Sequence, residues 1–189
     1  MNYILVPLAF SAPIIYAITK KQKVTFILDL DNTLIGFSQR KVPHLSGYKV
    51  NMGEFKGTVY KRPGLDRLIS AIRREHELAI WTAASKEWAD LALSNLKINP
   101  RKLKFFLTRE QTRDGNKDES ILEKLQINYS NAILIDDNSD HNFRNLLVIP
   151  PFHPSDSPYS DVLEKLAMFI EKYPGLSAAQ YKVAMSSLL

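Results

Sequence analysis

The sequence predicts an α/β fold built on a doubly wound parallel sheet. Short apolar segments typical of buried strands alternate along the chain with segments of helical periodicity. Several of the apolar segments end abruptly at acidic or hydroxyl-bearing residues, and parallel sheets bind ligands at the carboxyl ends of their strands. The length of 189 residues fits one domain with a substantial core, and 45% apolar and 24% charged residues are ordinary globular values.

The first half of the predicted sheet begins after a basic segment. Residues 24–28 form an apolar run that reads as a buried strand and ends at Asp29. Residues 36–60 are rich in turn formers, and the stretch GYKVNMGEFKGTVYKR is typical of small β-hairpins. Pro63 and Gly64 then open a helix. Its apolar stripe consists of Leu65, Leu68, Ile69 and Ile72.

Two further strands follow this helix. Residues 77–82, ELAIWT, form the second predicted strand, and Ser85 is a suitable N-cap for the next helix. That helix carries Trp88, Leu91 and Leu96. Residues 103–107 form the third predicted strand.

The C-terminal half continues the alternation. A short helix is predicted over 118–126, and the fourth strand over 131–135 ends at two adjacent aspartates. A fifth strand follows at 146–149, before Pro150 and Pro151 break the chain. A closing amphipathic helix uses Leu163, Leu166 and Ile170. The tail from residue 177 has weak helical character and receives no assigned element.

The N-terminus differs from the rest of the chain. Residues 3–18 carry no charge, and Lys20, Lys21 and Lys23 follow them. We interpret this segment as a membrane anchor or membrane-lying segment with the remaining chain in the cytoplasm; otherwise the protein is soluble in the cytoplasm or nucleus. A helix of this length would span only about 24 Å, so a cleaved signal and a buried strand or helix stay open as alternatives. The predicted organisation is residues 1–20, a domain over 21–175 and a tail over 176–189.

Composition excludes several classes of function. The chain contains no cysteine, which rules out disulfides, zinc–thiolate sites and thiol nucleophiles. Its 25 basic and 20 acidic residues give a net charge of +5. This charge would help to attract an anionic substrate but is too small to indicate nucleic-acid binding.

Paired carboxylates follow two strands of the predicted sheet. Asp29 and Asp31 follow the first strand, and Asp136 and Asp137 follow the fourth. Two unit charges 4 Å apart repel by about 4 kcal/mol at an effective dielectric of 20. A Ca²⁺ loop is excluded because it lacks the required acid, glycine and glutamate at positions 33, 34 and 40. Carboxylates, waters and a phosphate are the usual ligands of Mg²⁺, so the sequence predicts a Mg²⁺ and phosphate site.

Other residues at this edge of the sheet suit phosphoryl transfer. Thr82 offers a hydroxyl, its neighbour Ala83 a backbone N–H, and Lys117 a cation just before a helix. Such chemistry depends on positioning and on neutralising charge. Asp29 and Asp31 would divide the roles of nucleophile and general acid/base.

These stretches resemble a known family. DLDNT at 29–33 is similar to the first motif of the haloacid dehalogenase superfamily. KRPG at 61–64, WTAAS at 81–85, LTRE at 107–110 with NKDES at 116–120, and ILIDDNSDHNFRN at 133–145 follow with the order and spacing of the RNA polymerase II C-terminal-domain phosphatases. This type includes the dullard-type and nuclear-LIM-interactor-interacting phosphatases, and the resemblance covers about residues 24–173.

The resemblance implies a haloacid-dehalogenase-like, Rossmann-like sheet with a small β-hairpin insertion after the first strand. It also implies a Mg²⁺-dependent protein serine/threonine phosphatase that forms an aspartyl-phosphate and acts on a phosphorylated protein or peptide. The implied roles are nucleophile for Asp29, general acid/base for Asp31, phosphate binding for Thr82, Ala83 and Arg109, charge neutralisation for Lys117, and metal binding for Asp29, Asp31 (through its carbonyl), Asp136 and Asp137. A phosphatase for a small metabolite and a catalytically silent, membrane-tethered binding module are the alternatives.

The chain departs from the family pattern in places. Asp137 stands where the family often has asparagine, and Asp140 stands where it has proline. The insertion at 36–60 shows no clear aromatic pocket, so specificity for the polymerase tail is not implied. The four histidines lack the spacing of metal ligands and are expected at the surface, whereas Trp81 and Trp88 are expected in the core.

Overall fold

The computed structural model describes residues 3–6, 17–20, 23–52, 55–156 and 159–189. Its centre is a five-stranded sheet with the order β10-β9-β3-β7-β8, in which all neighbouring strands are parallel. This confirms the predicted fold, although the third strand is shorter than predicted. The strands are β3 (Thr25–Leu28), β7 (Glu77–Trp81), β8 (Phe106–Leu107), β9 (Ala132–Asp136) and β10 (Leu146–Val148).

The strand order reverses beside β3. The chain runs from β3 outward to β7 and β8, and then returns to build β9 and β10 on the other side of β3. In open parallel sheets, ligands bind in the crevice outside the carboxyl ends of the strands at such a switch point. The ends of β3 and β9 are therefore the place where a functional site is expected.

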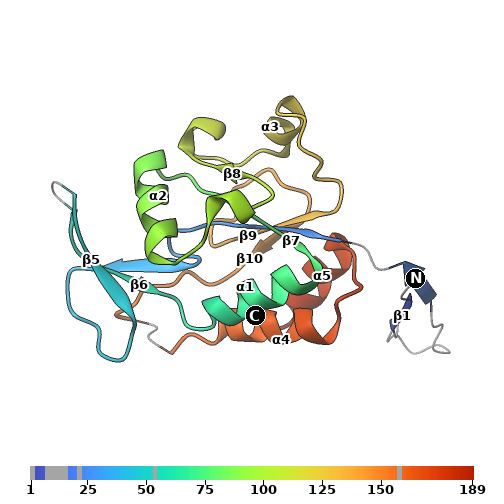
Figure 1. The fold of residues 1–189 in the computed structure, drawn as a ribbon, viewed down its shortest axis with the longest axis horizontal. Helices are drawn as coiled ribbons and strands as arrows, with labels where there is room; N and C mark the ends of the chain where they lie inside the picture. Colours follow the sequence, from blue (N-terminus) through green and yellow to red (C-terminus); the bar gives the residue numbers. More distant parts are fainter. Residues whose placement is uncertain (1–2, 7–16, 21–22, 53–54, 157–158) are drawn as a thin grey trace.

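Helices cover both faces of the sheet. In Figure 1, α1 (Leu65–Glu75), α4 (Val162–Lys172) and α5 (Ala178–Ser186) lie on one side, and α3 (Glu119–Lys124) lies on the other. The buried residues of β3 contribute to the cores on both faces of the sheet, because successive side chains of a strand point to opposite faces. Phe26 and Leu28 belong to the core that includes α1, α4 and α5, whereas Ile27 packs in the core that includes Leu122 of α3.

The predicted insertion after the first strand forms a small sheet of its own. It consists of β4 (Ile35–Ser38), β5 (Gly47–Met52) and β6 (Phe55–Lys61), which pair antiparallel in the order β4-β6-β5. Figure 1 shows β5 and β6 at one end of the molecule, on the side of α2 (Lys86–Asn95). The insertion and α2 thus flank the carboxyl end of β3.

The predicted membrane segment is only partly described. Where the structure describes it, it contains β1 (Tyr3–Val6) and the start of β2 (Ala17–Lys20), which pair antiparallel. Residues 7–16 lie outside the described residues. In the ranges given above, no helix has the length and apolar character needed to cross a membrane.

The C-terminal tail forms a helix that the sequence left unassigned. Ser177 caps α5 in a capping box with Gln180, and Tyr181 and Met185 are buried. The Tyr181 hydroxyl donates to the Tyr173 carbonyl at 2.6 Å and lies 3.1 Å from Nε2 of His76. His76 is buried, so its expected surface position is wrong. Its ring packs within the core that holds α5 against the sheet.

Candidate active site

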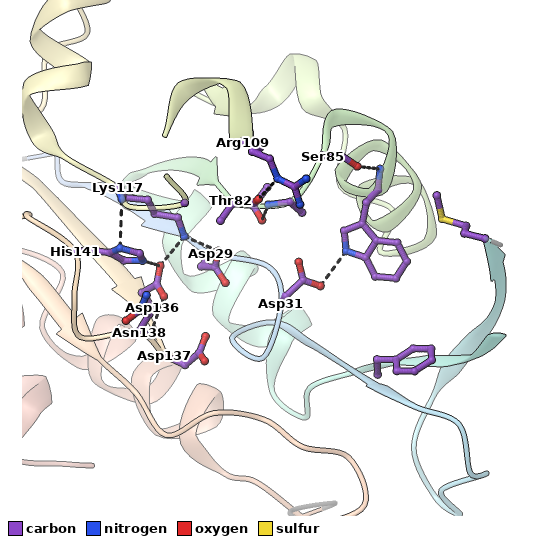
Figure 2. Close-up of a pocket in the computed structure, with 16 residues that line it drawn as sticks. Asp29, Asp31, Thr82, Ser85, Arg109, Lys117, Asp136, Asp137, Asn138 and His141 are labelled. Carbon is purple, nitrogen blue, oxygen red and sulfur yellow. Dashed lines mark hydrogen bonds and ion pairs between the residues drawn. The ribbon is translucent and has the colours of Figure 1, made fainter. Parts of the chain in front are cut away.

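Three carboxylates meet at the carboxyl ends of β3 and β9. Asp29 directly follows β3 and donates its backbone N–H to Ile135 of β9 at 3.1 Å. Asp136 is the last residue of β9, and Asp137 follows it. One carboxylate oxygen from each of the three aspartates lies within 4.8 Å of the other two. Figure 2 shows these side chains converging on one space, as predicted from the strand ends.

Lys117 is the cation between two of these acids. Its side chain is buried, and its ammonium lies 2.5 Å from Asp29 Oδ1 and 2.6 Å from Asp136 Oδ2. A tight turn brings it there, because Asp114 and Gly115 both have positive φ, at 52° and 82°, and Arg113 and Asn116 bond to each other across it. The lysine is thus held rigidly at the point where the acids would repel each other.

Asp31 points to a different part of the site. Its Oδ1 accepts a hydrogen bond from the indole Nε1–H of Trp88 at 2.9 Å. Trp88 lies on α2, which Ser85 caps through a 3.3 Å bond to the Trp88 N–H. Trp88 was expected in the core; it is only partly buried, and its polar edge serves the site instead. The second carboxylate of the DxDxT motif therefore stands apart from the Asp29, Asp136 and Asp137 cluster (Figure 2).

Thr33 and Arg62 fix the loop between these carboxylates. The Thr33 hydroxyl donates to Asp137 Oδ1 at 2.9 Å and accepts the Asp137 N–H at 3.1 Å. The buried Arg62 guanidinium donates to the Thr33 carbonyl at 3.2 Å and to the Ser160 hydroxyl. Burial lowers the pKa of Arg62 to about 10. The arginine of the KRPG stretch thus holds the loop that follows β3 in place.

The expected phosphate-binding residues follow the ends of β7 and β8. Thr82 Oγ1 accepts the Ala84 N–H at 3.1 Å, which leaves the hydroxyl proton free to donate to a ligand. Arg109 donates from Nε to the Ala83 carbonyl at 2.9 Å, so its guanidinium is held beside Thr82 (Figure 2). Donors on this side face the acids on the other, an arrangement that suits a phosphate bound between them.

One pocket of about 610 Å³ joins all of these groups. Phe37 of β4, Met52 of β5 and Trp88 add an apolar side to it. The insertion therefore contributes side chains to the pocket, although the sequence showed no clear aromatic pocket there. The residues predicted for the site all line the pocket, and they are Asp29, Asp31, Thr82, Ala83, Arg109, Lys117, Asp136 and Asp137.

The pKa values of the four acids are shifted in different directions. Burial raises the pKa of Asp29 to about 7, although Lys117 opposes the rise and Asp136 adds to it. Burial also raises the pKa of Asp31 and of Asp137. Burial acts the same way on Asp136, but hydrogen bonds from His141 and Lys117 outweigh it and hold the pKa of Asp136 below its ordinary value. Asp136 is therefore the acid that stays ionised most readily.

These residues fit a divalent cation. Asp29, Asp136 and Asp137 offer three oxygen ligands, the donor type that Mg²⁺ prefers, while a single lysine balances their charge. The raised pKa values indicate that the protein alone does not fully stabilise the ionised carboxylates. A bound cation would do so. Asp31 could add only its backbone carbonyl to such a site, since its carboxylate faces Trp88.

We expect the stabilisation by Mg²⁺ to grow with pH. Asp29 has its ordinary pKa of 3.8 in the unfolded chain and about 7 in the fold. Without metal, its contribution to stability is thus complete below pH 3.8 and is lost as the pH rises through 7. Mg²⁺ binds the ionised form, so the rise in Tm on adding Mg²⁺ should be larger at pH 8 than at pH 5.5. Differential scanning calorimetry against NaCl of equal ionic strength measures this, and an equal rise at both pH values would contradict it.

Among the site residues that sequence reasoning missed, His141 and Trp88 contact the acids directly. His141 was expected at the surface but is buried against Asp136, and Trp88 was assigned only to the core. The sequence signal for Trp88 was its place three residues after the N-cap Ser85, on the first turn of a helix that starts at the site. His141 follows the two aspartates by four residues, and nothing in that spacing indicated that the loop turns back over them.

Comparisons with known proteins relate this chain to a family and to solved structures. A profile of the family described as NLI interacting factor-like phosphatase matches residues 24–179. A structure of Fcp1, described as an essential RNA polymerase II CTD phosphatase, is 19% identical with a TM-score of 0.58, and covers 88% of this chain and 49% of its own. A fission yeast Fcp1 variant bound to beryllium fluoride is 17% identical with a TM-score of 0.56, and covers 88% and 51%. A search of curated proteins found no match. At these identities the structures are evidence for the fold alone, and the chain spans about half the length of each.

Proposed function

The chain belongs to the NLI interacting factor-like phosphatase family, and on this premise we propose that it is a Mg²⁺-dependent protein phosphatase. Its substrate would be phosphoserine or phosphothreonine in a protein. The observation that carries the proposal is the buried Asp29–Lys117–Asp136 cluster, which lies in one pocket with Asp31 and Thr82. A structural cluster of acids would have no need of an open pocket lined with phosphate donors.

The first chemical step would use both acids of the DxDxT motif. A carboxylate oxygen of Asp29 attacks the phosphorus, the bond from phosphorus to the seryl or threonyl oxygen breaks, and Asp29 becomes phosphorylated. Asp31 is protonated at this stage and gives its proton to the leaving oxygen. Burial raises the pKa of Asp31, which suits a group that must supply a proton.

The second step would return the site to its starting state. Asp31, now ionised, takes a proton from a water molecule, and the resulting hydroxide oxygen attacks the phosphorus. The bond between phosphorus and the Asp29 oxygen breaks, which releases inorganic phosphate. The Trp88 N–H holds Asp31 on the pocket side of α2 throughout.

The remaining residues would bind and neutralise the phosphoryl group. Thr82 donates its hydroxyl proton, Ala83 offers a backbone N–H, and Arg109 supplies a cation at the exposed side of the pocket. Lys117 balances the charge on Asp29. Mg²⁺ held by Asp29, Asp136 and Asp137 would add further positive charge where negative charge develops.

The shape of the pocket supports a protein substrate. The insertion adds Phe37 and Met52 as an apolar side next to the acids, which suits residues that flank a phosphorylated side chain. The net charge of +5 favours an anionic substrate of either size.

The test is hydrolysis by the full chain, with Mg²⁺ and with EDTA. The substrates are an aryl phosphate, a phosphoserine peptide and a set of small phosphorylated metabolites. We expect metal-dependent release of phosphate from the aryl phosphate and from the peptide. Turnover of metabolites alone would replace the protein substrate with a small one. Folded protein that turns over none of them would indicate a binding module.

A further inference from the structure

His141 lies at the junction between two loops of the site. Its side chain is 3% exposed, and it lines the pocket beside Lys117 and Asp136. We propose that His141 is a positioning residue, whose imidazole ties the loop carrying Lys117 to the carboxylate of Asp136. The inference rests on the proposed function, which assigns charge neutralisation to Lys117 and metal binding to Asp136.

The first contact of the ring is with Asp136. Nε2 of His141 lies 3.0 Å from Asp136 Oδ2, the same oxygen that the Lys117 ammonium approaches at 2.6 Å. The other oxygen, Oδ1, accepts the Asn138 N–H at 2.9 Å. Asp136 is therefore held by three donors, and its carboxylate plane is fixed. Figure 2 shows the histidine and the lysine reaching this aspartate from the same side.

The second contact of the ring is with the lysine loop. Nδ1 of His141 lies 3.3 Å from the Lys117 amide nitrogen and 3.1 Å from Asn116 Oδ1. An unprotonated Nδ1 accepts from the amide, and a protonated Nδ1 donates to the asparagine oxygen. A proton on Nε2 is compatible with both arrangements, so the ring can donate to Asp136 in either.

Neighbouring bonds show that the two loops are joined along their length. Asn116 donates from Nδ2 to the Asp140 carbonyl at 2.9 Å, and Glu119 donates its N–H to the Asn142 carbonyl at 3.1 Å. His141 supplies the central link of this series, and its ring contacts both the backbone of the lysine loop and the carboxylate of Asp136. The ring thus couples the position of the Asp136 carboxylate to that of the Lys117 backbone.

Two conservative substitutions separate the contacts. His141→Asn places a polar group where Nδ1 lies and keeps the link to the lysine loop, but does not reach Asp136. His141→Gln reaches the position of Nε2 and keeps the link to Asp136, but loses the loop. His141→Ala removes both. His44→Asn is the matched control, because His44 is exposed and its positive φ of 69° is one that asparagine tolerates.

The kinetic readout uses an aryl phosphate with saturating Mg²⁺. We expect kcat to fall about 10–100-fold in His141→Ala and less in the Asn and Gln variants, as for groups that orient a metal-binding carboxylate. KM should change less than about threefold, because substrate contacts remain. The wild type runs in the same assay, so its inactivity would count against the proposed function rather than against His141. Wild-type kcat in all three folded variants would overturn the inference.

A second readout does not depend on activity. Hydrogen exchange of the amides of residues 113–119 reports on the lysine loop directly. We expect faster exchange in His141→Ala and His141→Gln, and near wild-type exchange in His141→Asn and in the control. A merely structural histidine would lower Tm without this pattern. Equal exchange in the three His141 variants would overturn the inference even where kcat falls.

Discussion

Replacing Asp29 by asparagine should reduce hydrolysis of an aryl phosphate by at least about 10⁴-fold, as expected for removal of a nucleophile. The amide has nearly the same shape but cannot attack phosphorus. It can still accept a hydrogen bond from Lys117, which lies 2.5 Å from Oδ1 in the wild type. Steady-state phosphate release under saturating Mg²⁺ measures the loss.

The same variant makes a prediction about stability. Ionised Asp29 opposes folding above pH 7, because burial raises its pKa to about 7. In EDTA at pH 8, Asp29→Asn should therefore have a higher Tm than the wild type. Asp156→Asn is the control, since Asp156 is exposed and lies outside the pocket. More than about 1% residual activity in Asp29→Asn would contradict the role of nucleophile.

The sequence predicted most of the fold and the acidic part of the site for one physical reason. Parallel strands place their carboxyl ends at one edge of a sheet, so Asp29, Thr82 and Asp136 had to lie near one another once the strands were identified. Their positions could be predicted without knowing how the loops fold, because each residue directly follows or ends a strand. The roles of these residues remain proposals, whereas their proximity follows from the topology.

The contacts that the sequence could not predict come from loops and helix ends. His141 reaches Asp136 only because its loop bonds to the loop of Lys117, 24 residues away in sequence. Trp88 reaches Asp31 across 57 residues, and the rotation of α2 about its axis decides whether its N–H faces the site or the core. Such contacts depend on loop geometry that hydrophobic periodicity does not encode.

Replacing Lys117 by methionine should destabilise the metal-free protein by about 3–5 kcal/mol at pH 8, because it leaves two buried carboxylates without their cation. Methionine has a similar volume, so the loss reports on charge rather than on packing. Asp29 and Asp136 can then escape repulsion only by binding a proton or a cation. The destabilisation should thus be smaller at pH 5.5 than at pH 8, and urea unfolding in EDTA at both pH values measures it.

Adding Mg²⁺ distinguishes two roles of Lys117, which are to balance the charge of the acids and to support catalysis. A divalent cation can replace the missing positive charge, so Mg²⁺ should raise the Tm of Lys117→Met more than that of the wild type. Mg²⁺ cannot replace an ammonium placed at 2.5 Å from Asp29 Oδ1. In Lys117→Met, kcat should therefore stay at least about 10³-fold below the wild-type value. Lys165→Met, which changes an exposed lysine of α4, should leave both quantities unchanged. If Mg²⁺ restored kcat together with stability, Lys117 would serve only to balance the charge of the acids, and the transfer of phosphate would depend on the carboxylates and the metal alone.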